Sequence, residues 1–190
     1  MPESKKRKRL KVCIACSPGG HLVQVRQLAN VYEKYEYFYF TFSGPVAESL
    51  AQNARVRTIP NIVRKNPISW FVGAGLSAKI ALAERPDVVI TTGAGVVVFF
   101  CVFARLLGAK VIFIESMAKI EKPTLTARIL YPFSNLFIVQ WPNLLKFFPK
   151  ARFEGRLLCY FLRLATGKMV LTGSSRLSID SKPKVLYLIR

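Results

Sequence analysis

Residues 17–21, Ser-Pro-Gly-Gly-His, carry the residue types best suited to binding chemistry in this chain. They follow an apolar run, residues 12–16, and precede a helical pattern that starts near Leu22. A strand that ends in small residues and then opens a helix leaves backbone N–H groups free at the helix N-terminus, where the helix dipole favours an anion. Two glycines let a phosphate approach the backbone closely. The segment therefore predicts a phosphate site at the carboxyl end of a first strand.

His21 adds a titratable group at the same place and is the only histidine of the chain. An imidazole beside a bound phosphate is suited to act as a general base. A histidine at a helix start is equally suited to a local hydrogen bond. The residues alone leave both interpretations open.

A second glycine turn, Gly93-Ala94-Gly95, follows another apolar strand, residues 87–92. Such a turn is more often a structural link between a strand and a helix than a phosphate cradle. In a sheet with the Rossmann strand order, however, the first and fourth strands flank the topological switch point. The two glycine turns are then expected to face one crevice and to form a single concave anion site.

Glu115 ends an apolar strand, residues 110–115, and Ser116 follows it. A carboxylate at the carboxyl end of a buried parallel strand faces the same crevice, where it suits proton transfer or a hydrogen bond to a sugar hydroxyl. The alternative is a structural carboxylate that caps the following helix or pairs with a lysine. Asp87 starts its strand and is therefore expected at the opposite edge of the sheet, in a structural role.

Strand and helix patterns alternate along the chain and predict the elements that position these residues. The expected strands cover residues 11–16, 35–42, 56–59, 87–92, 110–115 and 135–139. The expected helices cover residues 22–32, 46–52, 68–84, 96–107 and 124–131. Near-continuous apolar runs such as residues 88–90 and 111–114 indicate strands buried on both faces, as in a parallel sheet. The expected fold is therefore a doubly wound, Rossmann-like α/β sheet.

The chain is strongly basic, with a formal net charge of +19 over 190 residues, 52% of which are hydrophobic. This length and apolar content fit one domain with a sizeable core. We expect a basic tail over residues 1–10, an α/β domain over 11–155 and a C-terminal segment over 156–190. The charge implies a polyanionic partner, namely a phosphorylated substrate, an anionic lipid surface or a nucleic acid. The basic residues gather at the ends without interleaved aromatics, which argues against nucleic acid.

Cysteine usage and the longest apolar stretch predict the compartment. The four cysteines do not have the spacing of a metal site, so we expect buried free thiols in a reducing, cytoplasmic environment and no bound metal. We expect no signal peptide, because the basic start runs directly into a short strand. The stretch from residue 94 to 107 is shorter than the roughly 20 residues that span a bilayer. We therefore expect a peripheral protein at the membrane rather than a spanning one.

Two segments predict surfaces for partners. Trp70 and Phe71 lie in an apolar stretch just after Arg64 and Lys65, a combination that suits a membrane-interface helix. The alternative for this stretch is an ordinary core-facing helix. Gln140-Trp141-Pro142 closes the last expected strand, where an aromatic residue suits either the core or a partner surface.

Four motifs occur here in the order seen in one family, at residues 17–22, 93–95, 114–116 and 137–142. Over roughly residues 11–155 the chain resembles the acceptor-binding, membrane-associated subunit of the two-subunit UDP-N-acetylglucosamine transferase that extends dolichol-diphosphate-GlcNAc. The prokaryotic relatives of the subunit that it resembles work in capsule and exopolysaccharide synthesis on undecaprenyl-diphosphate-sugars. The chain departs from the family at residues 119–121, where relatives often carry an Arg-Val pair, and in the segment beyond Arg156. The eukaryotic members also carry an N-terminal transmembrane anchor, where this chain has a basic run.

The resemblance implies the N-terminal-type half of a GT-B glycosyltransferase, similar to that half of the transferase that makes lipid II. It implies that a separate chain supplies the UDP-sugar pocket and that this chain binds a polyprenyl-diphosphate-linked sugar. Inversion at the anomeric carbon without a metal or other cofactor is implied as well. The residues expected to cradle the lipid diphosphate are Ser17, Gly19, Gly20, Gly93, Ala94, Gly95 and Ser116. By the same resemblance, His21 is the candidate base for the acceptor hydroxyl and Glu115 is its rival.

The sequence therefore predicts a glycosyltransferase subunit at the cytoplasmic face of a membrane. It is expected to bind the lipid-linked acceptor, to recruit the UDP-sugar-binding partner and to be inactive alone. One rival hypothesis is a non-catalytic enhancer or anchor of a partner that is already active. Another is a basic α/β protein that binds nucleic acid. The donor sugar is not identified, because its pocket lies on the partner.

Overall fold

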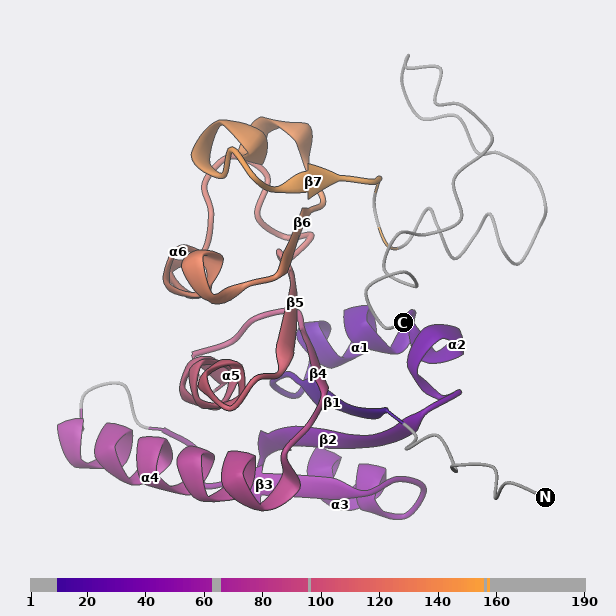
Figure 1. Ribbon diagram of the computed structural model, residues 1–190, viewed down its shortest axis with the longest axis vertical. Coiled ribbons are helices and arrows are strands. Elements are labelled where there is room, and N and C mark those ends of the chain that lie inside the picture. Colours follow the sequence, from indigo (N-terminus) through magenta and orange to yellow (C-terminus); the bar gives the residue numbers. More distant parts are fainter. Residues whose placement is uncertain (1–9, 63–65, 96, 156, 158–190) are drawn as a thin grey trace, which may run out of the picture.

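Seven parallel strands form one sheet in the order β3-β2-β1-β4-β5-β6-β7. The computed structural model describes residues 10–62, 66–95, 97–155 and 157 (Figure 1). The strands are β1 (Lys11–Ala15), β2 (Glu36–Phe42), β3 (Val56–Ile59), β4 (Val88–Thr91), β5 (Lys110–Ile114), β6 (Leu136–Val139) and β7 (Arg152–Phe153). The order reverses between β1 and β4, which is the switch point of a Rossmann-like sheet. The predicted fold class is confirmed.

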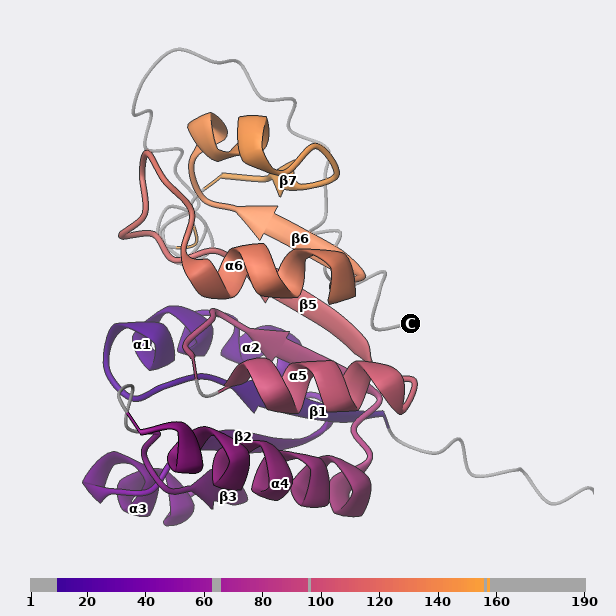
Figure 2. The ribbon, with the colours of Figure 1, turned by 90° about the vertical axis from the view of Figure 1, so that its left-hand side faces the viewer.

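Helices cover both faces of the sheet in two layers (Figures 1 and 2). One layer contains α1 (Gly20–Arg26), α2 (Ala29–Tyr32) and α3 (Pro45–Ala51). The other contains α4 (Pro67–Glu84), α5 (Val97–Leu106), α6 (Leu125–Leu130) and the 3-10 helices η1 (Tyr131–Phe133) and η2 (Pro142–Phe147). Two apolar cores therefore form, one on each face of the strands.

The apolar runs of the sequence explain the central strands. Every residue of β4 and β6, and all but the first of β1 and β5, is buried. On the α5 face, Phe40 stacks on Phe100 with ring centroids 4.2 Å apart, and Phe113 stacks on Phe137 at 4.7 Å. Because alternate residues of each strand feed the two cores, the whole sheet is fixed in register.

Two local features differ from the expected elements. The helix expected over residues 22–32 is two helices, α1 and α2, separated at Gln27 and Leu28. Leu28 is buried in the same core as Val25 and Tyr32, so the chain turns to bring all three against the sheet. The short strand β7 was not expected, because a pair of residues is too short to show any periodicity.

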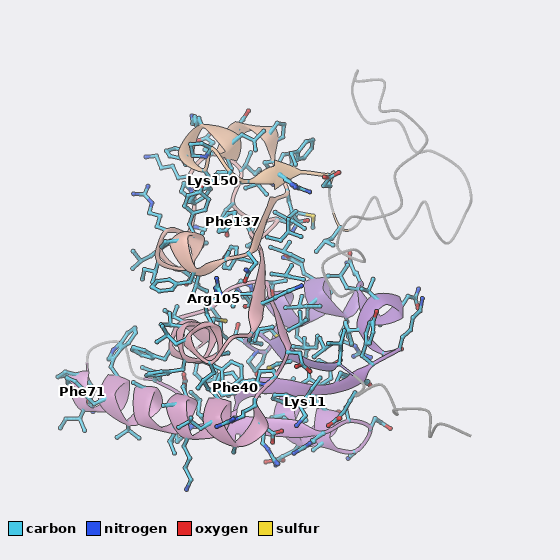
Figure 3. All side chains as sticks on the ribbon, viewed as in Figure 1. Lys11, Phe40, Phe71, Arg105, Phe137 and Lys150 are labelled. Atoms are coloured by element: carbon cyan, nitrogen blue, oxygen red, sulfur yellow. The ribbon has the colours of Figure 1, made fainter. Side chains whose placement is uncertain are left out.

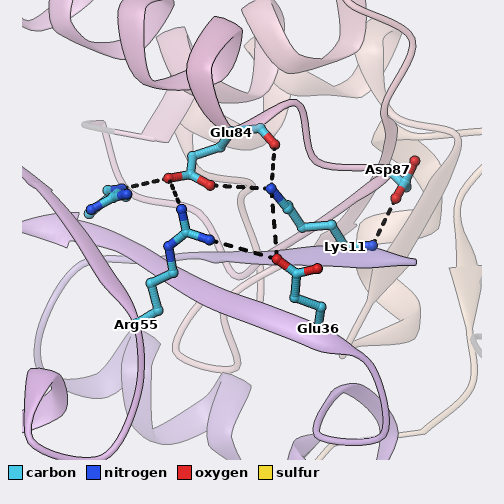
Figure 4. A network of polar contacts seen from close by, with 6 residues as sticks. Lys11, Glu36, Arg55, Glu84 and Asp87 are labelled. Atoms are coloured by element: carbon cyan, nitrogen blue, oxygen red, sulfur yellow. Dashed lines mark hydrogen bonds and ion pairs between the residues drawn. The ribbon is translucent and has the colours of Figure 1, made fainter. Parts of the chain in front are cut away.

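The amino edge of the sheet is held by an ionic network (Figure 4). Glu84, at the end of α4, accepts hydrogen bonds from Arg55 (2.8 Å) and Arg57 (2.6 Å) and pairs with the Lys11 ammonium at 3.5 Å. Asp87 accepts a hydrogen bond from the backbone N–H of Lys11 at 2.8 Å. The expectation that Asp87 is structural and lies opposite the glycine turns is confirmed.

Candidate functional site

The two glycine turns follow neighbouring strands at the carboxyl edge of the sheet. β1 and β4 are adjacent and parallel, so the turns that leave them lie on the same edge. Gly19 has a φ of 87° and Gly93 a φ of 92°, a region that a side chain makes unfavourable. Gly19, Gly20 and Gly95 are exposed, so their backbone is open to a ligand. The sheet thus brings together the two turns that the sequence assigned to one crevice.

Ala94 is strained between these glycines. Its φ of 126° lies where residues with a Cβ rarely occur, at a cost on the order of 1–3 kcal/mol. Strain of this kind persists only where surrounding contacts impose it, and it clusters at ligand sites. Thr91 helps to hold this turn, because its hydroxyl accepts a hydrogen bond from the Gly93 backbone N–H at 3.0 Å.

His21 lies in the first turn of α1, beside the end of β4. Its backbone carbonyl accepts a hydrogen bond from the Thr92 hydroxyl at 3.1 Å. The imidazole Nδ1 is buried and has no hydrogen-bond partner within the described part of the chain. Burial lowers the pKa of His21 below its usual value. A hydrogen bond with the Thr92 backbone and the nearby Glu115 charge both raise this pKa, but burial outweighs them. The lowered pKa favours the neutral imidazole, which is the form that accepts a proton.

Glu115 is completely buried, and both of its carboxylate oxygens accept hydrogen bonds. Oε1 accepts from the Ser116 N–H (2.8 Å) and the Thr124 hydroxyl (3.1 Å), and Oε2 accepts from the Thr124 N–H at 3.1 Å. Thr124 is the N-cap of α6, where its hydroxyl accepts the Ala127 N–H at 3.0 Å. Glu115 thus links the two ends of the loop of residues 116–124. This matches the structural alternative given in the sequence analysis, in which the carboxylate caps the following helix.

Ser116 and Ser17 differ in solvent exposure. Ser116 is 7% exposed, and its hydroxyl accepts the Ala118 N–H at 3.3 Å within the same loop. Ser17 is half-buried beside the first glycine turn. Of these two predicted phosphate contacts, Ser17 is the more accessible.

The segment predicted to meet a partner divides into a buried and an exposed part. Gln140 is 1% exposed, and its amide nitrogen donates to the Glu115 carbonyl (2.9 Å) and to the Gln24 side-chain oxygen (3.1 Å). Trp141 is half-buried and donates its indole N–H to the Met117 carbonyl at 2.7 Å. Pro142 is exposed. Gln140 therefore holds the loop in place, and only the following residues have surface to offer.

Several residues at this edge escaped the sequence-based prediction: Gln24, Thr92, Met117 and Thr124. Gln24 lies three positions after His21 in a helical pattern, and that spacing places the two on one side of a helix. This signal was available in the sequence. The partners of Thr92 and Met117 come from distant segments, so no local pattern points to them. Thr124 contacts Glu115, nine positions before it, and caps α6.

The predicted membrane-contact stretch lies at the start of α4. Phe71 is 79% exposed, whereas Trp70 is half-buried and packs edge-on against Phe99. Arg64 and Lys65 lie outside the described residues. Across the described part of the chain, no helix combines the length and the apolar character that crossing a bilayer requires.

The described cysteines are buried free thiols, as expected. Burial raises the pKa of Cys16 and of Cys101 to about 12, and it raises that of Cys13 as well. Within residues 10–62, 66–95, 97–155 and 157, no three His, Cys, Asp or Glu side chains are grouped so as to hold a metal ion.

Comparison with known proteins decides the family. The model of the family described as "Oligosaccharide biosynthesis protein Alg14 like" matches residues 41–157. The chain belongs to this Alg14-like family. The resemblance stated from the motifs is thereby confirmed, although the matched region begins after the turn that carries His21.

Two relatives of this Alg14-like chain carry the same name. It is 28% identical over 184 residues to the "UDP-N-acetylglucosamine transferase subunit ALG14" of Mus musculus, covering 80% of this chain and 85% of that protein. The human protein of the same name is 36% identical over 89 residues, covering 44% of this chain and 41% of that protein.

Solved structures share the fold of the Alg14-like chain. Acinetobacter baumannii MurG superposes with a TM-score of 0.58 at 19% identity, over 70% of this chain and 42% of MurG. The UDP-N-acetylglucosamine 2-epimerase of Rickettsia bellii gives a TM-score of 0.65 at 12% identity, over 84% of this chain and 48% of the epimerase. The chain therefore spans about half the length of these solved proteins.

Proposed function

We propose that this chain is the acceptor-binding subunit of a two-chain UDP-N-acetylglucosamine transferase, and that a second chain supplies the UDP-sugar pocket. The observation that carries the proposal is family membership together with fold. One Rossmann-like sheet matches about half of a MurG chain, and the named relatives are transferase subunits. Because those relatives are named as subunits, we expect a further chain to complete the transferase.

The glycine turns form the acceptor side of the proposed site. The exposed backbone at Gly19, Gly20 and Gly95 lies at one edge of the sheet, where N–H groups suit the oxygens of a diphosphate. Ser17 is open to the same edge, and Ala94 shapes the second turn. We assign the polyprenyl diphosphate to this edge.

His21 is the proposed base. Its side chain is only half-buried, and its lowered pKa favours the neutral imidazole, which is the form that accepts a proton from the acceptor hydroxyl. As the proton passes to His21, the hydroxyl oxygen forms a bond to the anomeric carbon of the donor sugar. The bond from that carbon to the UDP oxygen breaks, and UDP leaves with the electron pair. Glu115 is a weaker candidate for the base, because both of its oxygens are already engaged by Ser116 and Thr124.

Membrane contact is proposed for the exposed side of α4. Ile68, Phe71 and Val72 are 70%, 79% and 50% exposed, and Figure 3 shows Phe71 at the end of the helix remote from the sheet. Lys79 is the one charged residue between Pro67 and Ala83 in the sequence. A helix end this apolar is costly to leave in water and suits the boundary of a bilayer. The protein would then lie peripherally on the cytoplasmic face, where anionic lipid attracts its basic residues.

The proposed partner interface involves Trp141 and Pro142, at the carboxyl edge beside the acceptor loops. Gln140 is buried and acts there through its contacts rather than by touching a partner. The interface follows from the mechanism, because the donor sugar must be brought to this same edge of the sheet.

Co-expression and reconstitution test the proposal. The tagged full chain is purified from membranes, and the co-purifying chain is identified by mass spectrometry. UDP-N-acetylglucosamine transfer to a polyprenyl-diphosphate-GlcNAc acceptor is then measured for each chain alone and for both together. Activity that requires both chains, and that falls in the His21→Ala variant, supports the proposal. Transfer by the partner alone makes this chain an enhancer or anchor, and transfer by this chain alone overturns the divided site.

A further inference from the structure

Gln24 connects three elements of the proposed acceptor edge through a single atom. Its side-chain oxygen Oε1 accepts a hydrogen bond from the Met117 backbone N–H at 3.3 Å and another from the Gln140 side-chain nitrogen at 3.1 Å. Met117 belongs to the loop after β5, and Gln140 follows β6. Because a backbone N–H only donates, the amide of Gln24 must present its oxygen to Met117.

The loop that Gln24 contacts is fixed at its other points. Glu115 holds both of its ends, through Ser116 and Thr124. The Trp141 indole N–H donates a hydrogen bond to the Met117 carbonyl at 2.7 Å. The backbone N–H and the carbonyl of Met117 are therefore both hydrogen-bonded, to Gln24 and to Trp141 respectively. Gln24 is thus the link between this loop and α1.

The same helix carries His21. Residues three apart on a helix lie on one side of it, so His21 and Gln24 share the side of α1 that meets the carboxyl edge of the sheet. The Thr92 hydroxyl fixes the first turn of α1 to β4, while Gln24 fixes its next turn to the loop after β5. The separation between the proposed base and this loop is set by these two contacts.

We propose that Gln24 is a positioning residue, which holds the Met117 loop against α1 through its side-chain oxygen and thereby sets the shape of the acceptor site beside His21. This inference rests on the proposed function and deepens it. It concerns the fit of the acceptor, not the donor, because every element in the network belongs to this chain. A glutamate at position 24 also presents an oxygen to both donors, so the role predicts tolerance of Gln24→Glu and intolerance of an apolar residue of similar size.

The test compares Gln24→Met with Gln24→Glu in the reconstituted two-chain complex. Gln24→Met keeps the side-chain volume and a high helix propensity but removes the acceptor atom. We expect the acceptor KM to rise roughly 10-fold, since small misplacements at a reacting centre are costly, with the KM for UDP-N-acetylglucosamine unchanged. Gln24→Glu should stay within about twofold of the wild-type chain on both constants. Gln52→Met, at an exposed position after α3, is the matched control.

A second measurement is independent of turnover. Amide hydrogen exchange of the full chain should be faster at Met117 in Gln24→Met than in Gln24→Glu. Trp141→Phe removes the contact on the other side of Met117 and should likewise speed amide exchange at Met117, which keeps the test valid if Gln24→Met folds poorly. Unchanged exchange and unchanged acceptor KM in these variants overturn the role of Gln24, as does a Gln24→Glu variant as impaired as Gln24→Met. If the wild-type complex shows no transfer at all, the proposed function fails, and the exchange result still reports on the loop.

Discussion

The Thr92 hydroxyl donates a hydrogen bond to the backbone carbonyl of His21, with 3.1 Å between the two oxygens. The contact joins residues 71 positions apart and connects the two glycine turns, because Thr92 precedes Gly93 and His21 follows Gly20. Thr92 is fully buried. The position of the proposed base is therefore fixed by the strand next to its own, in addition to its helix.

Replacing Thr92 by valine should weaken this junction. Thr92→Val keeps the shape of the side chain and removes the hydroxyl, so we expect a loss of about 1 kcal/mol in the free energy of unfolding. Thr92→Ser retains the donor and should lose less. Chemical denaturation of both variants measures the difference. A valine variant as stable as the wild-type chain contradicts a stabilising role for the hydrogen bond.

The pH dependence of transfer should follow the neutral form of His21. Burial lowers the pKa of His21, so the imidazole loses its proton at a pH below its usual pKa of about 6.5. We expect kcat/KM to rise with pH and to level off once this lowered pKa is passed. A pH–rate profile of the two-chain complex measures it, and an acid limb centred above 6.5 contradicts the assignment. His21→Gln should reduce kcat by roughly 10²–10⁴-fold while still capturing the partner, and should abolish that limb.

Most strands of the sheet were predictable because they are apolar runs, which can be recognised without knowing their partners. β3 lies at residues 56–59, as predicted. The other predicted strands differ from the observed ones by one residue at one end or, for β4, at each end. The alternation of strands and helices predicted the doubly wound class, and the adjacency of β1 and β4 was expected on the condition that the sheet has the Rossmann order. The break between α1 and α2 was not predictable, because it depends on Leu28 reaching the core.

The site was predictable only in part, since its side chains pair over long distances. The glycine turns, His21 and Glu115 stand out by type and place in the sequence. The contacts of Gln140 do not, because one partner, Gln24, is 116 positions away. Gln140 was predicted to lie at a partner surface. It is buried instead, hydrogen-bonded to Gln24 and to the Glu115 carbonyl.

Replacing Glu115 by glutamine tests whether Glu115 is the catalytic base or a structural carboxylate. In Glu115→Gln, one oxygen becomes an NH₂ group that faces either the Ser116 or the Thr124 backbone N–H, and the lost acceptor leaves a buried donor unpaired. We expect the free energy of unfolding to fall by about 1–3 kcal/mol, with the residual activity following the folded fraction. Thermal unfolding and kcat are measured on the same samples. A fully stable variant whose kcat falls more than 100-fold would instead support Glu115 as the base.

The exposed end of α4 should govern binding to vesicles. Burial of an exposed phenylalanine contributes about 1.5–3 kcal/mol, so Phe71→Ser is expected to lower partitioning onto anionic vesicles roughly 10- to 100-fold. Its stability should be unchanged, because the side chain is 79% exposed. Val46→Ser, on α3 in the other layer, is the control and should bind as the wild-type chain does. Co-sedimentation with vesicles of mixed neutral and anionic lipid measures the effect, and equal binding by both variants rules out contact through Phe71.

Acid should weaken the fold through Glu84. Burial alone raises the pKa of Glu84, but the hydrogen bond from Arg57 and the charges of Arg55 and Lys11 outweigh it and hold the pKa below its usual value. A carboxylate with a lowered pKa stabilises the fold above its unfolded-state pKa of about 4.3, and this stabilisation is lost as the pH falls through the lowered value.

The Glu84→Gln variant isolates this contribution. We expect it to lose about 2 kcal/mol at pH 7, less than a fully buried pair, because the two arginine side chains are 44% exposed and screened by water. The deficit should shrink as the pH falls below 4, where the wild-type carboxylate is protonated as well. Glu36→Gln is the matched control, since Glu36 pairs with Lys11 and Arg55 at 3.8 and 3.7 Å but is 50% exposed, and it should change stability by less than about 0.5 kcal/mol. Urea denaturation from pH 3 to 8 measures all three chains, and a deficit that is independent of pH contradicts the ionic origin of the effect.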